Sequence, residues 1–165
     1  MKKETTFSEI KKAGYTDKSI NQEIQDNLIA RIKSEKAVFP DLIGYENSVI
    51  PQLKKAIIAG HHINLLGLRG QAKTKIARSM IDLLDEYIPV VKGSEINDSP
   101  FRPISKYSQD LLYKYGDNTP ISWVHRSERY YEKLATPDVN VSDLIGDIDP
   151  IKAATLKLEY SDEGV

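Results

Sequence analysis

Apolar residues recur at helical spacing near the start of the chain. From position 20 to position 32, isoleucine or leucine returns every fourth residue with polar residues between, as in an amphipathic helix. Ser19 stands directly before this run as its predicted N-cap. A shorter helix is predicted ahead of it, because Thr6 and Glu9 have the spacing of a capping box. We interpret residues 1–38 as a helical appendage packed on the main domain.

A second helical pattern follows a turn-rich segment at residues 39–46. It consists of four apolar positions, Ile50, Leu53, Ile57 and Ile58. Asn47 or Ser48 is the predicted N-cap, and Gly60 is the predicted end of the helix.

The chain is organised around a short apolar run, a glycine-containing turn and a helical run, in that order. Residues 63–66 predict a strand. The turn leads into a helix predicted from Lys73 to about Glu86. The apolar positions of this helix are Ile76, Met80, Leu83 and Leu84. Strand, glycine turn and helix form the context that a phosphate-binding loop requires.

The region after this helix carries weaker signals. Residues 88–91 form a short apolar run, but Pro89 excludes it from the centre of a sheet. One helix is predicted between positions 93 and 119, with Ser105 as its cap and Gly116 as its end. Its predicted inward-facing residues are Leu111, Leu112 and Tyr115.

Basic and aromatic residues are interleaved at residues 123–126 and 129–134. Such interleaving is able to stack bases and hold phosphates. The alternative is a half-buried strand whose arginine and lysine heads reach solvent. We favour the strand, because the formal net charge of the chain is only −1. A nucleic-acid partner is therefore not expected.

Composition narrows the class of protein. The chain has 165 residues, of which 40% are hydrophobic and 28% are charged, as in an ordinary globular domain. It contains no cysteine, so disulfides and thiolate chemistry are excluded. No apolar run approaches the ~20 residues that span a bilayer, and the charged start leads into no apolar segment of a secretory signal. We expect a cytoplasmic protein with no membrane partner.

The turn itself matches most of a phosphate-binding pattern. In G-x-x-x-x-G-K-[ST], Gly67, Lys73 and Thr74 occupy the first, seventh and eighth positions. Backbone N–H groups of such a loop point at phosphate oxygens, the lysine adds positive charge, and the Thr74 hydroxyl ligates Mg²⁺. The predicted ATP-binding residues of the loop are Gly67, Arg69, Gly70, Gln71, Ala72, Lys73, Thr74 and Lys75. The alternative is a plain connection in which Lys73 and Thr74 only open a helix.

Ala72 stands where the pattern has its second glycine. If this position has a left-handed backbone, the Cβ of alanine costs about 1–2 kcal/mol. If the position already has a helical backbone, alanine is tolerated, and Gly70 supplies the permissive conformation instead. The sequence leaves both conformations open.

The sequence lacks a second acidic strand after the loop. A phosphate-loop ATPase needs a carboxylate, at the end of an apolar strand, to hold Mg²⁺ and orient water. Asp85 and Glu86 imitate this Walker B signature, but they lie on the predicted helix that the loop opens. We therefore interpret the chain as truncated before Walker B, and expect it to bind nucleotide weakly and not to hydrolyse it.

Three strings together resemble the magnesium chelatase ATPase subunit and MoxR-type AAA+ proteins. They are residues 41–46, the loop at residues 67–74, and residues 132–138 followed by 142–146. The likeness covers nearly the whole chain and implies an α/β fold with the parallel sheet of an AAA+ P-loop NTPase. Only the N-terminal part of that domain is expected, at residues 39–165, behind the small helical prefix.

The resemblance also implies a function. Such proteins form homo-oligomeric rings that use ATP and Mg²⁺ to remodel a partner protein, often one that carries a von Willebrand A domain. By the same resemblance, Lys73 is the catalytic residue present in this chain. Ile43, Gly44 and Tyr45 would lie against adenine, and residues 142–159 would form an extra hairpin that reaches toward partners.

Two other classes of function stay open. One is a regulatory or protein-interaction module whose nucleotide site is degenerate. The other is a nucleic-acid remodeller that uses Trp123, Arg126 and Arg129.

Overall fold

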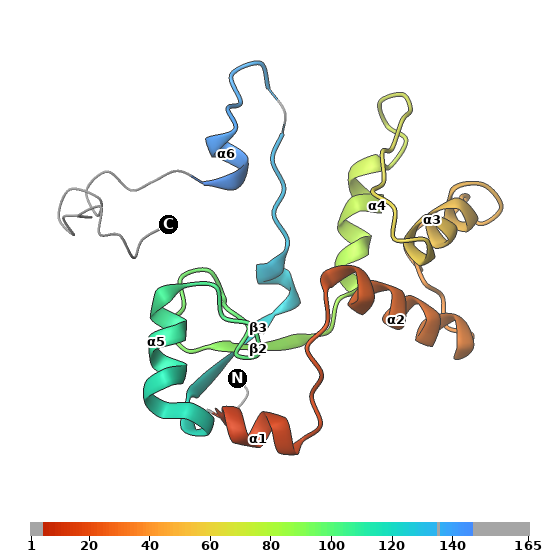
Figure 1. The fold of residues 1–165 in the computed structure, drawn as a ribbon. Helices are drawn as coiled ribbons and strands as arrows, with labels where there is room; N and C mark the ends of the chain where they lie inside the picture. Colours follow the sequence, from red (N-terminus) through yellow and green to blue (C-terminus); the bar gives the residue numbers. More distant parts are fainter. Residues whose placement is uncertain (1–4, 135, 147–165) are drawn as a thin grey trace. The chain divides into compact units, whose positions relative to one another are not determined.

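The computed structural model of the chain describes residues 5–134 and 136–146 (Figure 1). The chain divides into two compact units, Met1–Tyr130 and Tyr131–Val165. The sheet, the main hydrophobic core and the glycine-containing loop all belong to the first unit.

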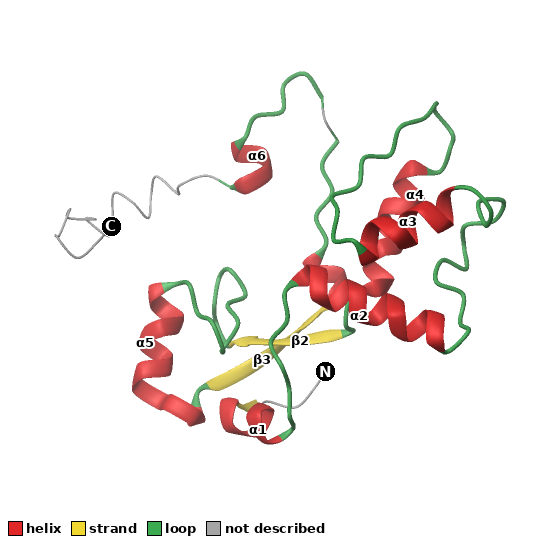
Figure 2. Ribbon diagram, turned by 45° about the vertical axis from the view of Figure 1, so that its right-hand side comes forward, coloured by secondary structure: helices red, strands yellow, loops and turns green. Residues whose placement is uncertain are grey.

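The sheet of the first unit is small and antiparallel. Its strands are β1 (Thr5–Thr6), β2 (Tyr87–Val91) and β3 (Pro120–His125), in the order β1-β3-β2. Both neighbouring pairs run antiparallel, and Figure 2 shows β2 and β3 side by side. The predicted fold, a parallel P-loop sheet of AAA+ type, is therefore wrong for the described part of the chain.

Residues 63–66, predicted as the strand before the loop, form no strand. A strand of a parallel sheet is buried on both faces, yet Leu66 is 88% exposed. The described strands offer little to pair with. The central strand β3 has neighbours on both sides, the outer edge of β2 is unsuited to pairing, and the other edge strand, β1, has only two residues.

The outer edge of β2 is closed by two features. Pro89, which lies opposite Trp123 in the register, has no N–H to offer a further strand. The N–H of Val91 points away from β3 and donates to the Asp98 carbonyl at 2.9 Å. The prediction that the proline keeps this segment out of a central strand is confirmed, since β2 is an edge strand.

The first two helices form where their caps predict them. Helix α1 (Phe7–Lys12) follows Thr6, whose backbone N–H donates to the Glu9 carboxylate at 2.9 Å. Helix α2 (Ile20–Lys33) follows Ser19, whose Oγ accepts from the next turn's backbone at 3.2 Å. Both predicted helices are confirmed.

Helix α3 (Val49–Ile58) is also confirmed, with Ser48 as its N-cap residue. Its side chains Ile50, Leu53 and Ile57 are buried, as predicted, whereas Ile58 is half exposed and lies outside the core.

The helix after the loop is shorter than predicted. Helix α4 (Lys73–Ser79) passes into a 3₁₀ turn, η1 (Met80–Leu83), and does not reach Glu86. The cause lies in α2, since Asn27 donates to the Leu83 carbonyl at 2.9 Å and Arg31 donates to the carbonyl just before it. Those carbonyls are the acceptors that a continuing α-helix would need.

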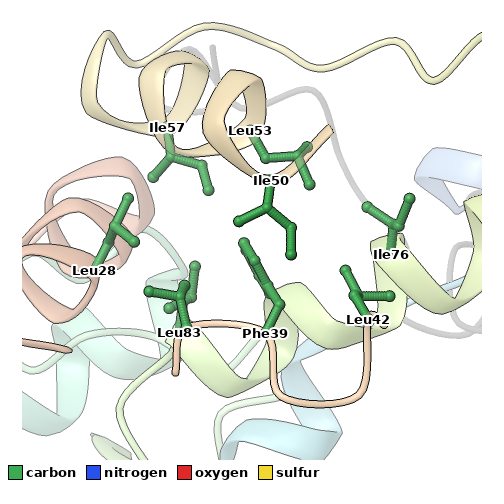
Figure 3. Close-up of a cluster of buried hydrophobic side chains, with 9 residues drawn as sticks. Leu28, Phe39, Leu42, Ile50, Leu53, Ile57, Ile76 and Leu83 are labelled. Carbon is green, nitrogen blue, oxygen red and sulfur yellow. The ribbon is translucent and has the colours of Figure 1, made fainter. Parts of the chain in front are cut away.

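The main core joins α2, α3, α4 and η1 with the segment before α3 (Figure 3). Its buried members are Leu28, Val38, Phe39, Leu42, Ile50, Leu53, Ile57, Ile76 and Leu83. Burying one leucine or isoleucine side chain contributes about 1.5–3 kcal/mol. Because Leu28 is fully buried in this cluster, α2 is an integral part of the core of the first unit.

A second cluster packs α1 against the sheet. Phe7 and Ile10 are buried with Ile121 of β3, and the ring of Phe101 meets Phe7 edge-on with centroids 5.0 Å apart. Leu112 of helix α5 (Lys106–Tyr115) packs on the same cluster.

Helix α5 begins and ends as predicted. Ser105 Oγ accepts from the Ser108 backbone at 3.2 Å, and Gly116 ends the helix, followed by a 3₁₀ turn, η2 (Gly116–Asn118). Leu111 is half buried, but Tyr115 is 44% exposed, so the prediction that Tyr115 faces inward is wrong. A last 3₁₀ turn of this unit, η3 (Arg126–Arg129), follows β3.

The second unit contains helix α6 (Ser142–Ile145). Asp143 of this helix makes two hydrogen bonds to the preceding segment. Its carboxylate accepts from Asn140 N at 3.0 Å, and its backbone carbonyl accepts from the Tyr131 hydroxyl at 3.0 Å. The hairpin expected at residues 142–159 lies outside the described residues from position 147 onward. Within the described ranges, no helix is both long and apolar enough to cross a membrane.

Candidate functional site

The candidate site is the loop at residues 67–72 together with the start of α4. Lys73 is half buried, and its Nζ donates to the carbonyls of Gly67 at 2.8 Å and Leu68 at 2.5 Å. The loop therefore closes around the lysine ammonium group. Both contacts are charge-assisted hydrogen bonds, the stronger kind.

The backbone of the loop is left-handed at two positions, Gly70 (φ 81°) and Ala72 (φ 52°, ψ 18°). Of the two conformations that the sequence left open for Ala72, the structure has the strained one, which costs about 1–2 kcal/mol for a residue with a Cβ. Strain of this kind gathers at ligand-binding segments. It also turns successive N–H groups in the way that anion-binding loops do.

Gln71 closes the loop from the other side. Its Oε1 accepts a hydrogen bond from the backbone N–H of Leu68 at 3.0 Å. A Cβ placed on Gly67 would lie 2.2 Å from the same Oε1 atom, so the amide of Gln71 fills the space that glycine leaves open. A side chain at position 67 would therefore have to displace the exposed Gln71 amide from this contact.

The other predicted residues of the loop are accessible. The side chains of Arg69, Thr74 and Lys75 are exposed, and Thr74 directly follows Lys73 on the first turn of α4. The structure therefore brings the predicted phosphate-contacting residues together in one accessible loop, although the strand predicted before it is missing.

Only part of the segment predicted to contact adenine packs near the loop and α4. Tyr45 packs against the main core together with Leu65, the residue two positions before the loop. Figure 3 shows Leu42 beside Ile76 of α4, which ties the same segment to the helix of the candidate site. In contrast, the Ile43 side chain is exposed.

Gly44 contributes a turn to this segment. Its N–H donates to the Glu46 carboxylate at 3.0 Å. The backbone N–H groups of Glu46 itself and of Gly44 lower the pKa of the Glu46 carboxyl. This arrangement fixes the turn and leaves its outer surface open to solvent.

One cleft lies apart from the loop and has no counterpart among the sequence predictions. It has a volume of about 560 Å³ and runs between α2 and the segment after η1. Among its lining residues, Arg31 and Arg126 both donate to the Asp82 carbonyl, and Arg126 also pairs with the Asp82 carboxylate at 3.0 Å. These cations are engaged within the unit, so the cleft indicates no particular ligand.

The residues of the nucleic-acid alternative are also engaged internally. Trp123 Nε1 donates to Thr5 Oγ1 at 3.1 Å, and the Arg129 guanidinium is held by Glu23 through two bonds of 2.6 Å. Residues 120–125 form the half-buried strand β3. The favoured interpretation as a half-buried strand therefore holds for residues 123–125 and is wrong beyond them. Arg126–Arg129 form the turn η3, and the Arg129 side chain packs against Glu23 instead of reaching solvent.

The Mg²⁺ prediction depends on Thr74 alone. Across residues 5–134 and 136–146, no group of three or more histidine or acidic side chains is placed to hold a metal ion. Mg²⁺ bound with a nucleotide takes only one or two protein ligands, and substrate phosphates and waters supply the rest. The exposed Thr74 hydroxyl, next to Lys73 in the loop, is therefore compatible with a single protein ligand to Mg²⁺ that binds together with a phosphate ligand.

Comparisons of the chain with protein-family models, with curated proteins and with solved structures found no match. The resemblance to magnesium chelatase-like and MoxR-type proteins is accordingly carried by the motifs in the sequence alone.

Proposed function

We propose that the loop at residues 67–74 binds the phosphates of ATP together with Mg²⁺. The observation that carries the proposal is the position of Lys73, whose ammonium group is wrapped by the carbonyls of Gly67 and Leu68. These two contacts hold the lysine ammonium group at the loop instead of leaving it extended in solvent. The lysine that the sequence pattern predicts to bind phosphate is thus the one that the loop carbonyls contact.

Each residue has a distinct role in this proposal. The ammonium group of Lys73 neutralises phosphate charge, and the backbone N–H groups from Gly70 to Thr74 donate to phosphate oxygens. The Thr74 hydroxyl holds Mg²⁺. The nucleotide brings the triphosphate and its metal ion, and the chain supplies positive charge, donors and a fixed loop.

The wider role in the proposal comes from the resemblance. In this role the chain is the ATP-binding front half of a ring-forming protein that couples ATP hydrolysis to the remodelling of a partner, such as one with a von Willebrand A domain. The proposal does not include the AAA+ fold, because the described sheet is antiparallel. Ring formation and partner binding are supported by the sequence strings at residues 41–46, 67–74 and 132–138.

A second candidate is an interaction module with a degenerate nucleotide site. It is favoured by Leu66 and Leu68, whose side chains beside the loop are 88% and 77% exposed. Retention of radiolabelled ATP on a filter separates the two candidates. Retention that requires Lys73 supports nucleotide binding, and no retention supports the interaction module.

Replacing Lys73 with alanine is expected to weaken ATP·Mg²⁺ binding by about 10- to 150-fold, the range for one hydrogen bond to a charged group. Isothermal titration calorimetry of both proteins measures the change. Lys55→Ala, which removes an exposed lysine from α3, is the matched control and should bind as the wild type does. Equal affinities for the wild type and Lys73→Ala would contradict the assignment.

Replacing Thr74 with alanine is expected to remove most of the enhancement of nucleotide binding by Mg²⁺, while the lysine charge and the loop amides remain. Thr74→Ser keeps a hydroxyl at the same position and should keep the enhancement. The measurement is the ratio of ATP affinities with Mg²⁺ and with excess chelator. If this ratio is the same for all three proteins, Thr74 is not a metal ligand.

A further inference from the structure

One continuous stretch of the first unit carries only positive charge. Residues 47–81, which contain α3, the loop and α4, include no aspartate and no glutamate. The basic residues of this stretch are Lys54, Lys55, Arg69, Lys73, Lys75 and Arg78. They give it a formal charge of +6, and because the whole chain carries −1, the rest of the chain carries −7. Such a separation of charge within one chain points to an anionic partner for the basic stretch.

The basic stretch surrounds a projecting loop. Helices α3 and α4 both pack on the main core, and the loop that joins them projects from the two helices (Figures 1 and 2). Lys55 on α3, Arg69 in the loop and Lys75 on α4 are exposed. A charged surface that approaches this loop therefore meets positive charge, although the chain as a whole is slightly negative.

The same loop exposes apolar side chains. Leu66 and Leu68 are 88% and 77% exposed, and Gly67 between them adds no side chain of its own. Ile58, at the end of α3, and Ile63 are exposed as well. A single exposed leucine is ordinary, but here four apolar side chains follow one another along one short segment among basic residues. Interfacial binding to a bilayer uses this combination, since apolar side chains enter the boundary of the acyl chains while basic residues attract anionic headgroups.

The residue types favour a lipid surface over a nucleic acid. Residues 47–81 contain no phenylalanine, tyrosine or tryptophan, so the stretch has no aromatic ring of these residues on which bases would stack. Contacts with a phosphate backbone alone would leave Leu66 and Leu68 in water. An anionic bilayer offers partners to both the cations and the leucines.

We propose that α3, the loop and the start of α4 form a peripheral surface that binds anionic lipid bilayers, with Leu66 and Leu68 inserted among the headgroups. The expectation of no membrane partner rested on the lack of a spanning segment, which a peripheral surface does not need. The inference goes beyond the proposed function, because binding to lipid requires no nucleotide.

The test is flotation of the protein, without nucleotide, with vesicles of phosphatidylcholine that contain about one third phosphatidylserine. The wild type should float with these vesicles and not with pure phosphatidylcholine, and a high salt concentration should release it. Leu66→Gln should weaken binding about tenfold in a lipid titration, because one leucine side chain no longer enters the bilayer. Ile104→Gln removes a side chain that is 79% exposed ahead of α5, and this matched control should bind as the wild type does.

A pair of charge variants tests where the attraction lies. Lys54→Gln with Lys55→Gln should weaken binding by about fivefold for each lysine. Lys106→Gln with Lys114→Gln, on α5, removes the same charge from another part of the unit and should change little. An equal loss in both double variants would overturn the inference, because the total charge of the chain and not this surface would then govern binding.

Insertion of the loop is measured directly with a fluorescent label. The chain has no cysteine, so Leu66→Cys provides one position for an environment-sensitive fluorophore. Its emission should shift to the blue on addition of the anionic vesicles, whereas the same label on Ile104→Cys should not respond. A label at position 66 that does not respond would overturn the insertion of the loop.

The outcomes separate the inference from the proposed function. If the wild type does not float with the anionic vesicles, or if Leu66→Gln binds them equally well, the lipid surface is overturned. Binding to a single-stranded oligonucleotide in place of the vesicles would also overturn it and would assign the surface to nucleic acid. Calorimetric titration with ATP·Mg²⁺ decides the nucleotide site separately, and Leu66→Gln should bind ATP·Mg²⁺ as the wild type does.

Discussion

Replacing Glu23 with alanine is expected to lower the free energy of unfolding by about 3–5 kcal/mol, the loss that follows when one partner of a buried ion pair is removed. The remaining partner, Arg129, would keep its charge in a site where its side chain is only 11% exposed. Urea unfolding followed by circular dichroism measures the loss.

The geometry explains the size of this effect. The two carboxylate oxygens of Glu23 each accept from one nitrogen of the Arg129 guanidinium at 2.6 Å, and Glu23 Oε1 also accepts from Asp85 N at 2.7 Å. One carboxylate therefore ties α2 to η3 and to the segment before β2. Bidentate pairs of this kind combine strong hydrogen bonds with fixed orientation.

A tyrosine, Tyr15, lies close to the charges of this ion pair. Burial, and then the charges of Asp17, Glu23 and Asp85, raise the pKa of Tyr15 to about 12. Asp85 also favours the charged form of Arg129, but removing Glu23 takes away the two hydrogen bonds that compensate the burial of the guanidinium.

The double variant Glu23→Leu with Arg129→Met provides the control. Removing both charges replaces the ion pair with apolar packing, so this protein should recover most of the stability that Glu23→Ala loses. Lys11→Ala, which breaks an exposed pair with Asp117, should leave the unfolding midpoint nearly unchanged. If the double variant loses as much as the sum of its single changes, the two residues are not coupled.

The helices were predictable because their signals are local. The capping residues Thr6, Ser19 and Ser105 lie next to the turns that they cap, and each lies where the sequence places it. The end of α4 was not predictable, because it is set by Asn27 and by Arg31, more than 50 positions away. Local periodicity carries no information about such partners.

The prediction of the sheet was wrong for the same reason, because the pairing of strands also depends on residues far apart in the sequence. β1 has only two residues, and its contacts reach across the chain, as in the bond between Thr5 and Trp123. Glu23 illustrates the same limit, since it belongs to the polar positions of α2 by pattern but is buried by Arg129, 106 positions later. Whether a short strand forms, and whether a charged side chain is buried, both depend on residues distant in the sequence.

The candidate loop lies between these cases. The sequence pattern identified Gly67, Lys73 and Thr74 as parts of one loop, although the strand predicted before that loop does not form. The left-handed backbone of Ala72 and the contact of Gln71 with Leu68 were not predictable, because each depends on how the loop closes in three dimensions.

Asp98 is the second residue for which a large effect is expected, and no sequence motif marked it. The residue is 3% exposed, and all its acceptor positions are used. Oδ1 accepts from the backbone N–H groups of Ile104 at 2.7 Å and Ser105 at 3.2 Å. Oδ2 accepts from three hydroxyls, those of Ser94, Ser105 and Ser108.

These bonds fix the loop between β2 and α5. Burial by itself would raise the pKa of the Asp98 carboxyl, but the hydrogen bonds from Ser105, Ile104 and Ser108 outweigh it and hold the pKa well below its ordinary range. A carboxyl whose pKa is lowered on folding stabilises the protein fully above its unfolded value of about 3.9. This contribution is lost as the pH falls below that value toward the folded pKa.

Asp98→Ala is therefore expected to lose about 3 kcal/mol or more of unfolding free energy at neutral pH, because it leaves several buried donors without acceptors. Asp98→Asn should lose less, since its amide oxygen still accepts from Ile104 N and Ser105 N while its NH₂ group donates to the serine hydroxyls, which are able to rotate and accept. Urea unfolding between pH 3 and pH 7 measures both. The stability gap between the wild type and Asp98→Asn should narrow as the pH falls below about 4, because only the wild type carries the titrating carboxyl. A gap that stays constant with pH would mean that the charge of Asp98 contributes nothing, and that the loop is held by hydrogen-bond geometry alone.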